Sequence, residues 1–242
     1  MRNALKKYGL LLAVLGCAGE NRPAPDSVNA QASSPGATAT KDAPRTLTND
    51  ASRTLTPDAR RTVLFVGTSL TAGLGLDPDS AYPQLIQSKI DKAGLRYEVI
   101  NAGYSGETSS GLLRRLDWLL RQPIAIVVIE TGANDGLRGI PVETMKDNIQ
   151  QIIDRIRGAR PDAQIALVQM EAMPNLGKAY TQGFHEVFPE LARRNNVRLL
   201  PFLLENVAGV RALNQLDGIH PNEAGERIVA ENVWKALRPL LR

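Results

Sequence analysis

The stretch that decides the fold is TVLFVGTSLT, residues 62–71. Its first five residues are apolar or β-branched, and such side chains favour extended strands. Because the run shows no polar alternation, it predicts a strand inside a parallel sheet that is covered on both faces. The run stops at Gly67, and Ser69 follows after one threonine. Ser69 is therefore either the cap of the next helix or a nucleophile at a strand end, and the local sequence fits both.

Four further apolar runs have the same character, at residues 97–101, 124–130, 163–169 and 197–202. Amphipathic stretches that predict helices lie between and after them, near residues 81–93, 109–121, 142–158, 181–195 and 222–238. One of these shows the i, i+3, i+4 spacing of a buried helix face at Met145, Ile149, Ile152, Ile153 and Ile156. Strands that alternate with helices predict an α/β fold, a three-layer α/β/α sandwich formed by one domain over residues 61–242.

The composition is that of a globular protein with one sizeable core, since 43% of the 242 residues are hydrophobic and 22% are charged. The formal net charge is +4, and part of this excess lies near the N-terminus in Arg2, Lys6 and Lys7. The other basic residues alternate along the chain with acidic ones, and no basic stripe is interleaved with aromatic residues. We therefore expect no nucleic acid as a partner. The oligomeric state is not readable from the sequence, and a monomer is the default expectation.

The N-terminal segment, MRNALKKYGLLLAVLGC at residues 1–17, has the basic start and short apolar run of a signal peptide. Its end resembles a bacterial lipoprotein signal, which implies cleavage before Cys17 and a lipid anchor on that cysteine. Leu15 is bulkier than the residue usual at its position, and the alternative is a plain secretory signal cleaved near Ala18. Either alternative predicts an exported protein, periplasmic or anchored to a membrane of a bacterial envelope. Cys17 is the single cysteine, so no intramolecular disulfide can form.

Residues 18–60 are rich in Ala, Pro, Ser, Thr, Asp and Arg and contain few large apolar side chains. Such a segment cannot bury enough surface to offset the entropy of ordering it. We therefore predict a disordered tether between the signal segment and the folded domain.

Polar loops follow the first three predicted strands and precede the last helix. Ligands of open parallel sheets bind at the carboxyl ends of the strands, so the sequence predicts one cleft lined by these loops. The first loop is neither a Gly-x-Ser-x-Gly elbow, since Thr71 replaces the second glycine, nor a P-loop. The four loops are Gly67–Leu70, Asn101–Gly106, Thr131–Gly136 and Asp217–Pro221.

The most informative pair is Asp217 and His220, because the chain has only two histidines. The other, His185, falls within a predicted helix, where a packing or exposed histidine is the simpler interpretation. A carboxylate three residues before a histidine on a turn can fix the imidazole tautomer, and the imidazole can then activate a serine. The backbone N–H groups of Ser69 and Gly103 and the amide of Asn134 could stabilise an oxyanion.

Taken together, the blocks GTSL (67–70), NAG (101–103), GAND (132–135) and DGIHP (217–221) resemble the SGNH/GDSL hydrolase superfamily. Their flanking segments are similar to the branch of bacterial arylesterases and multifunctional thioesterase I/lysophospholipases, and the resemblance extends over residues 62–240.

The resemblance implies a flavodoxin-like sheet of five parallel strands and no metal or organic cofactor. It also implies a triad and an oxyanion hole formed by Ser69, Asp217, His220, Gly103 and Asn134.

One residue departs from the family pattern, because Thr68 stands where an aspartate usually precedes the nucleophile. A threonine hydroxyl can satisfy fewer loop N–H groups than a carboxylate can. The sequence therefore predicts a looser turn around Ser69, with hydrolysis retained at lower turnover, and predicts that Thr68→Asp raises turnover.

The predicted substrate is a short- or medium-chain acyl or aryl ester, or a thioester or lysophospholipid, because apolar residues border the expected cleft. The segment 171–183 occupies the place of a substrate-side loop, although its apolar residues could equally close the sheet edge. The alternatives are a carbohydrate O-acyl esterase of the envelope and a non-catalytic binding lipoprotein. The bordering residues are Leu74, Leu76, Tyr104, Met173, Pro174, Leu176 and Tyr180.

Overall fold

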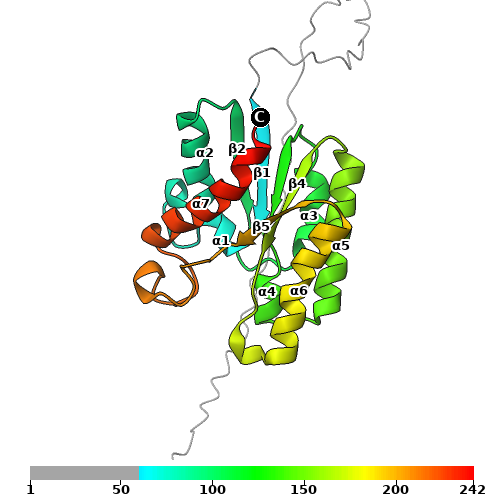
Figure 1. Cartoon of the computed structure of the whole chain (residues 1–242), viewed down its shortest axis with the longest axis vertical. Helices are drawn as coiled ribbons and strands as arrows, with labels where there is room; N and C mark the ends of the chain where they lie inside the picture. The colour runs from blue at the N-terminus through cyan, green and yellow to red at the C-terminus, as the bar shows by residue number, and fades with distance from the viewer. Residues whose placement is uncertain (1–59) are drawn as a thin grey trace, which may run out of the picture. The chain divides into compact units, whose positions relative to one another are not determined.

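A computed structural model describes residues 60–242, so the signal segment, Cys17 and all of the predicted tether except Arg60 lie outside the described residues. The described chain forms one five-stranded parallel sheet, in which the strand order is β2-β1-β3-β4-β5 (Figure 1). This order is the flavodoxin-like one, which confirms the predicted fold class. The strands are β1 (Arg61–Gly67), β2 (Tyr97–Gly103), β3 (Ile126–Ile129), β4 (Gln164–Gln169) and β5 (Arg198–Phe202).

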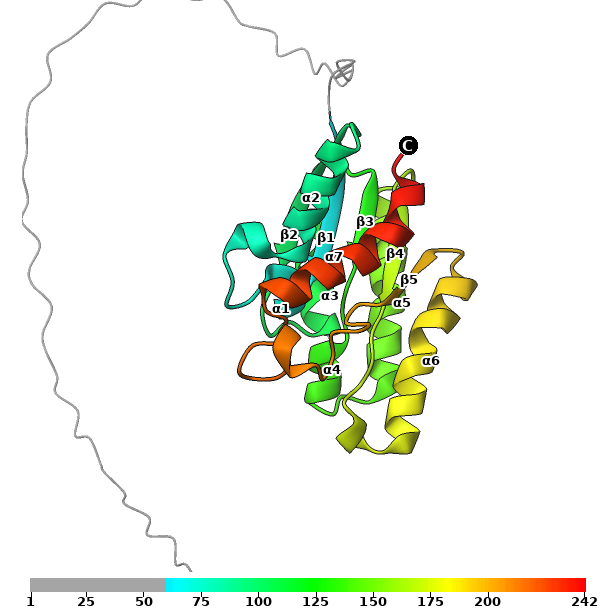
Figure 2. The ribbon, with the colours of Figure 1, turned by 60° about the vertical axis from the view of Figure 1, so that its left-hand side comes forward.

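Helices cover both faces of the sheet. On one face α2 (Tyr82–Lys92) packs against α7 (Glu223–Leu237). On the other, α5 (Val142–Ala159) packs between α3 (Ser109–Leu119) and α6 (Lys178–Arg194), as Figure 2 shows. In the part of the chain that the structure describes, no helix is both long and apolar enough to cross a membrane.

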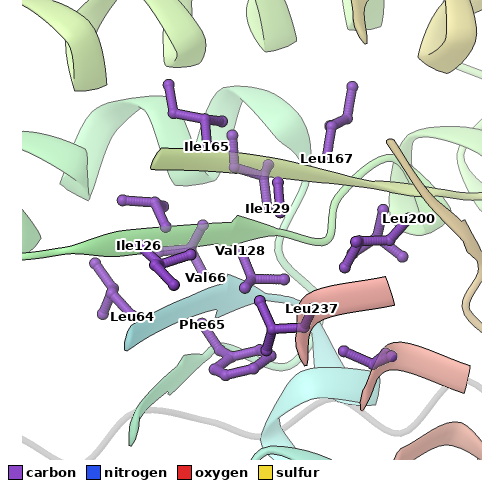
Figure 3. Packing of buried hydrophobic residues seen from close by; sticks show 14 of the residues in the cluster. Leu64, Phe65, Val66, Ile126, Val128, Ile129, Ile165, Leu167, Leu200 and Leu237 are labelled. Carbon is purple, nitrogen blue, oxygen red and sulfur yellow. The ribbon is translucent and has the colours of Figure 1, made fainter. Parts of the chain in front are cut away.

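The core lies on the three central strands, as their unbroken apolar runs predict. Leu64, Phe65 and Val66 of β1 are fully buried and pair in register with Val127, Val128 and Ile129 of β3. Figure 3 shows the side chains of Leu64, Phe65 and Val66 alternating between the two faces of the sheet. Phe65 meets Tyr82 of α2 edge to face, with ring centroids 5.7 Å apart.

The structure adds short elements that periodicity could not predict. The helices α1 (Ser69–Ala72) and α4 (Ala133–Leu137) follow β1 and β3 directly and carry two of the predicted site residues. Each is shorter than two helical turns, so neither develops a repeating apolar pattern. Short 3₁₀ turns complete the described elements at Pro78–Ser80, Pro174–Leu176, Arg211–Leu213 and Arg238–Leu240.

Candidate active site

Ser69 is the first residue of α1, immediately beyond the carboxyl end of β1. The cap of this helix is Thr68, whose hydroxyl accepts a hydrogen bond from the Leu70 N–H at 3.4 Å. The cap of this helix is therefore Thr68 and not Ser69, so helix capping does not account for Ser69. Ser69 itself is nearly buried, and its hydroxyl is directed to a histidine from the other end of the domain.

Three predicted site residues form one hydrogen-bonded series. Ser69 Oγ lies 2.8 Å from His220 Nε2, and His220 Nδ1 lies 2.7 Å from Asp217 Oδ2. The second carboxylate oxygen of Asp217 accepts the backbone N–H groups of Ile219 and His220 at 2.9 and 3.0 Å. This is the arrangement in which a carboxylate orients a histidine and the histidine activates a serine.

The hydrogen bonds to Asp217 also control its charge. The N–H of Ile219, the imidazole and N–H of His220 together lower the pKa of this carboxyl to about 2. Asp217 is therefore ionised throughout the range in which an imidazole titrates, and it can stabilise the imidazolium form of His220.

The second histidine is not part of this series. His185 lies exposed on α6, and its Nδ1 pairs with Glu171 Oε1 at 2.7 Å. The structure thus brings together only one of the two histidines with a serine, as the sequence predicted.

Asn134 lies at the start of α4, next to the loop that follows β2. Its side-chain Nδ2 donates to the Glu107 carbonyl oxygen at 3.0 Å, which fixes the amide plane and leaves the second N–H of Nδ2 available. The adjacent Gly106 has a left-handed backbone with φ of 78°, and Arg138 Nη2 donates to its carbonyl oxygen at 2.9 Å. No group among residues 60–242 accepts a hydrogen bond from the Gly106 N–H.

The geometry does not support Gly103 as an oxyanion donor. Its N–H donates to Asn101 Oδ1 at 2.9 Å, so the group is already engaged within its own strand. A Cβ atom at this position would lie 2.3 Å from the backbone nitrogen of Ala72. Gly103, the last residue of β2, therefore allows α1 to pack closely on this strand, and its engaged N–H does not fit the predicted role of an oxyanion donor.

The turn before Ser69 has a buried carboxylate partner that the sequence analysis missed. Glu130, directly after β3, accepts the Thr68 N–H at 2.7 Å and the Thr71 hydroxyl at 2.9 Å. The Thr68 hydroxyl lies 3.0 and 3.1 Å from its two oxygens. Burial raises the pKa of Glu130, while the hydrogen bonds from Thr68 and Thr71 oppose this rise.

Glu130 changes the expectation of a looser turn, because a carboxyl group at the end of the neighbouring strand β3 holds the turn through its hydrogen bonds with Thr68 and Thr71. The carboxylate reaches the turn only because Gly67 has no side chain: a Cβ there would lie 2.6 Å from Glu130 Oε2. The signal in the sequence is one acidic residue that ends an otherwise apolar strand.

Polar contacts also fix the loops around Asn134 and Gly106. Arg115 of α3 forms an ion pair with the buried Glu107 at 2.6 Å and donates to the Ala102 carbonyl at 2.7 Å. Asp135, next to Asn134, accepts the backbone N–H and the hydroxyl of Ser109 at 2.8 and 2.6 Å. Burial raises the pKa of Asp135, although the hydrogen bonds from Ser109 oppose this rise.

The residues predicted to border the substrate cleft separate into two groups. Leu74 and Tyr104 are exposed beside the site: the Leu74 carbonyl accepts from Gln215 at 2.7 Å, and the Tyr104 N–H donates to the Gly67 carbonyl at 2.8 Å. Tyr180 instead donates its hydroxyl to the Ile140 carbonyl at 2.7 Å and lies against Phe184, so its role is in packing. Met173 is exposed in the segment before α6.

Comparison with known proteins finds one family for most of this domain. The model described as the GDSL-like lipase/acylhydrolase family matches residues 65–228. The esterase TesA of Pseudomonas aeruginosa is 40% identical over 180 residues, which cover 74% of this chain and 89% of that protein. The thioesterase 1/protease 1/lysophospholipase L1 of Escherichia coli K12 is 36% identical, over 74% of this chain and 84% of that protein.

Solved structures agree with the sequence comparison. A crystal structure of TesA superposes with a TM-score of 0.71 at 40% identity, over 75% of this chain and all of that chain. The psychrotrophic esterase EstA from Pseudoalteromonas sp., inhibited by monoethylphosphonate, gives a TM-score of 0.70 at 36% identity, over 75% of this chain and 98% of that chain.

Proposed function

This chain belongs to the GDSL-like lipase/acylhydrolase family and is a carboxylic ester hydrolase, and we propose that its reaction passes through an acyl-enzyme on Ser69. The observation that carries the proposal is the continuous series of hydrogen bonds from Ser69 through His220 to Asp217. A decayed, non-catalytic domain would have no need to hold a hydroxyl, an imidazole and a carboxylate at 2.7–2.8 Å.

In the first half of the reaction, His220 Nε2 takes the proton of Ser69 as Ser69 Oγ attacks the ester carbonyl. The imidazolium that forms is stabilised by the ionised Asp217 and then gives its proton to the leaving alcohol. Water repeats these steps on the acyl-enzyme, so the acid is released and Ser69 is restored.

The negative charge of the tetrahedral intermediate needs fixed donors. We assign this role to the Ser69 N–H, the second N–H of Asn134 Nδ2 and the Gly106 N–H, which replaces the predicted Gly103. Support comes from the contact between Asn134 and Glu107, which holds the Asn134 amide beside the loop of Gly106. Loss of one donor from such a site typically lowers the rate ~10²–10³-fold.

The substrate class that fits best is a short- to medium-chain acyl or aryl ester. Leu74 and Tyr104 supply exposed apolar surface next to the serine. Thioesters and lysophospholipids remain within the proposal, because the names of the relatives include a thioesterase and a lysophospholipase.

A panel of p-nitrophenyl esters of increasing chain length tests this proposal, beside acetylated xylan and a lysophospholipid. We expect highest kcat/KM on a short or medium ester, and a loss of at least ~10³-fold in Ser69→Ala. His185→Ala is the matched control for His220→Ala, since both remove a histidine that faces a carboxylate. Equal activity of the two histidine variants would exclude the assigned triad.

We also propose export and a lipid anchor at Cys17, on the sequence of residues 1–17. Stable anchoring needs more than one acyl chain, which lipoprotein processing provides. In bacteria that carry the gene, Cys17→Ser should move the protein from the membrane fraction to the soluble fraction. An unchanged distribution would exclude the anchor and leave the proposed hydrolysis untouched.

A further inference from the structure

Basic side chains gather at the edge of the sheet that lies opposite Ser69. Because all five strands are parallel, the connections that lead into them meet at one edge, while Ser69 and His220 lie at the other. We call this surface the basic edge and define it by six exposed arginines: Arg61, Arg96, Arg157, Arg193, Arg194 and Arg242.

One half of the basic edge is assembled around Tyr97, the first residue of β2. The Arg61 N–H donates to the Arg96 carbonyl at 3.0 Å, and the Arg61 guanidinium donates to the Tyr97 hydroxyl at 2.9 Å. The same hydroxyl donates to the Arg242 carbonyl at 3.1 Å. Three arginines from the start of β1, the start of β2 and the end of the chain are therefore neighbours.

The other half lies where α5 and α6 end. The Arg157 guanidinium donates to Asn195 Oδ1 at 3.2 Å and to the Asn195 carbonyl, which joins the last turn of α5 to the C-cap of α6. Arg193 and Arg194 are the last two residues of α6, and both are exposed. This half is thus a second group of three arginines on the same edge.

Acidic side chains are distributed in the opposite way. At the basic edge Asp91 is already paired with Arg60 at 3.1 Å, and Glu98 and Asp162 are exposed. The edge around Ser69 instead presents many exposed acidic residues on its loops, among them Asp77, Asp79, Glu205, Asp217 and Glu223. The net charge of +4, which counts the whole chain, therefore does not show that the described domain has one basic and one acidic end.

Two observations indicate what covers the basic edge. The chain enters the described domain there, at Arg60, after 59 residues that contain the predicted lipid attachment site. Residues 18–59 carry acidic and basic side chains in near balance, so they offer no complementary charge themselves. An anionic lipid surface matches both the sign and the breadth of the patch, because it attracts each exposed basic group over a Debye length.

We propose that the basic edge docks on an anionic phospholipid surface and orients the domain with Ser69 away from it. The seven residues of β1 separate Arg61 from the serine turn by ~20 Å at the usual rise of a strand. In this orientation the site opens to the aqueous side, where soluble esters and dissolved lysophospholipids reach it. Docking does not depend on the lipid at Cys17, which would only keep the domain near the surface.

The test uses the full chain carrying Cys17→Ser, sedimented with vesicles of phosphatidylcholine alone or mixed with phosphatidylglycerol. We expect greater binding to the mixed vesicles, and loss of that difference at ~0.5 M salt. R193E/R194E should weaken binding to the mixed vesicles about tenfold or more. The matched control K178E/R211E makes the same change in net charge at the acidic end and should alter binding less than ~2-fold.

Thermal unfolding of each variant checks that it is folded, and R61E/R242E serves in place of R193E/R194E if the latter is not. Equal weakening by the control pair would overturn the proposal, because net charge rather than a face would then drive binding. So would equal binding to both vesicle types, or retention on a heparin column without vesicle binding. None of these outcomes bears on ester hydrolysis, which is measured separately on a soluble ester.

Discussion

At the scale of single residues, Glu130 is the group whose removal tests the support of the nucleophile. In Glu130→Gln the side chain keeps its size but replaces one of the two oxygens that accept from the Thr68 N–H and two hydroxyls with an NH₂ group. We expect kcat to fall roughly 10–100-fold with little change in KM, because a displaced nucleophile slows the reaction without weakening substrate binding. Steady-state kinetics on one p-nitrophenyl ester provides both constants.

The matched control is Glu98→Gln, which changes an exposed glutamate on β2, the strand on the other side of β1, and should leave kcat unaltered. If both variants retain full kcat, Glu130 is a structural partner only and does not position Ser69.

Glu130 also reverses the expectation for Thr68→Asp. The hydroxyl of Thr68 lies within 3.1 Å of both Glu130 oxygens, so an aspartate there would place two carboxylates in contact. One of two such groups has to hold a proton. We therefore expect no gain in kcat at neutral pH, and a fall in kcat as the pH rises and both groups ionise. A pH–rate profile that lies above the wild-type one throughout would support the original expectation.

Asp217 gives a second prediction at this scale. Asp217→Asn keeps the size of the side chain but cannot stabilise the imidazolium form of His220, so kcat should fall on the order of 10³–10⁴-fold.

The pKa of Asp217 is lowered to about 2 in the folded state. Its contribution to stability is therefore complete above its usual pKa and is lost as the pH falls toward 2. The acid limb of activity above about pH 4 should accordingly arise from another group.

At the scale of elements, the contact between α2 and α7 contains a buried carboxyl group. Glu226 of α7 accepts the Tyr82 N–H at 2.7 Å and so caps the start of α2, which has no side-chain cap of its own. Burial raises the pKa of Glu226 to about 8, although the hydrogen bond from Tyr82 opposes this rise.

The raised pKa has a definite consequence for stability. The unfolded chain loses this proton near the usual pKa of glutamate, whereas the folded protein keeps it until about pH 8. The folded state therefore binds the extra proton, and stability should fall as the pH rises between these values. Glu226→Gln should flatten this slope and raise the melting temperature at pH 8, and thermal unfolding at pH 5 and pH 8 measures both effects. A parallel slope in the variant would show that Glu226 is ionised in the fold.

The helices and strands also show how much of the fold and of the site can be predicted from the sequence. Long strands and helices were predicted to within a few residues, because their apolar periodicity extends over several turns or an entire strand. Gly103 was chosen over Gly106 because the sequence places both glycines near the end of β2, and only the engaged N–H of Gly103 and the positive φ of Gly106 distinguish them. Glu130 was missed because its partners, Thr68 and Thr71, come from the turn and short helix that follow β1, and contacts between the ends of neighbouring strands are not local information.

At the scale of the whole molecule, the parallel sheet explains why residues far apart in the sequence meet. Ser69 and His220 are 151 positions apart, yet the carboxyl ends of the strands bring them to 2.8 Å. The same topology collects the arginines of the basic edge at the opposite end, although they are scattered among acidic residues in the sequence. One architectural rule thus accounts for both the catalytic site and the proposed docking surface.

Ser69 as the covalent nucleophile is the central claim, and an activated phosphonate ester tests it, because such a compound phosphonylates a reactive serine and releases its leaving group. After reaction of the full chain with an ethylphosphonate inhibitor, peptide mass spectrometry locates the adduct. We predict one adduct, on Ser69, which appears in step with loss of ester hydrolysis and is absent from Ser69→Ala. An adduct on another residue that accompanies the loss of activity, or full inactivation of hydrolysis with Ser69 unmodified, would contradict the account.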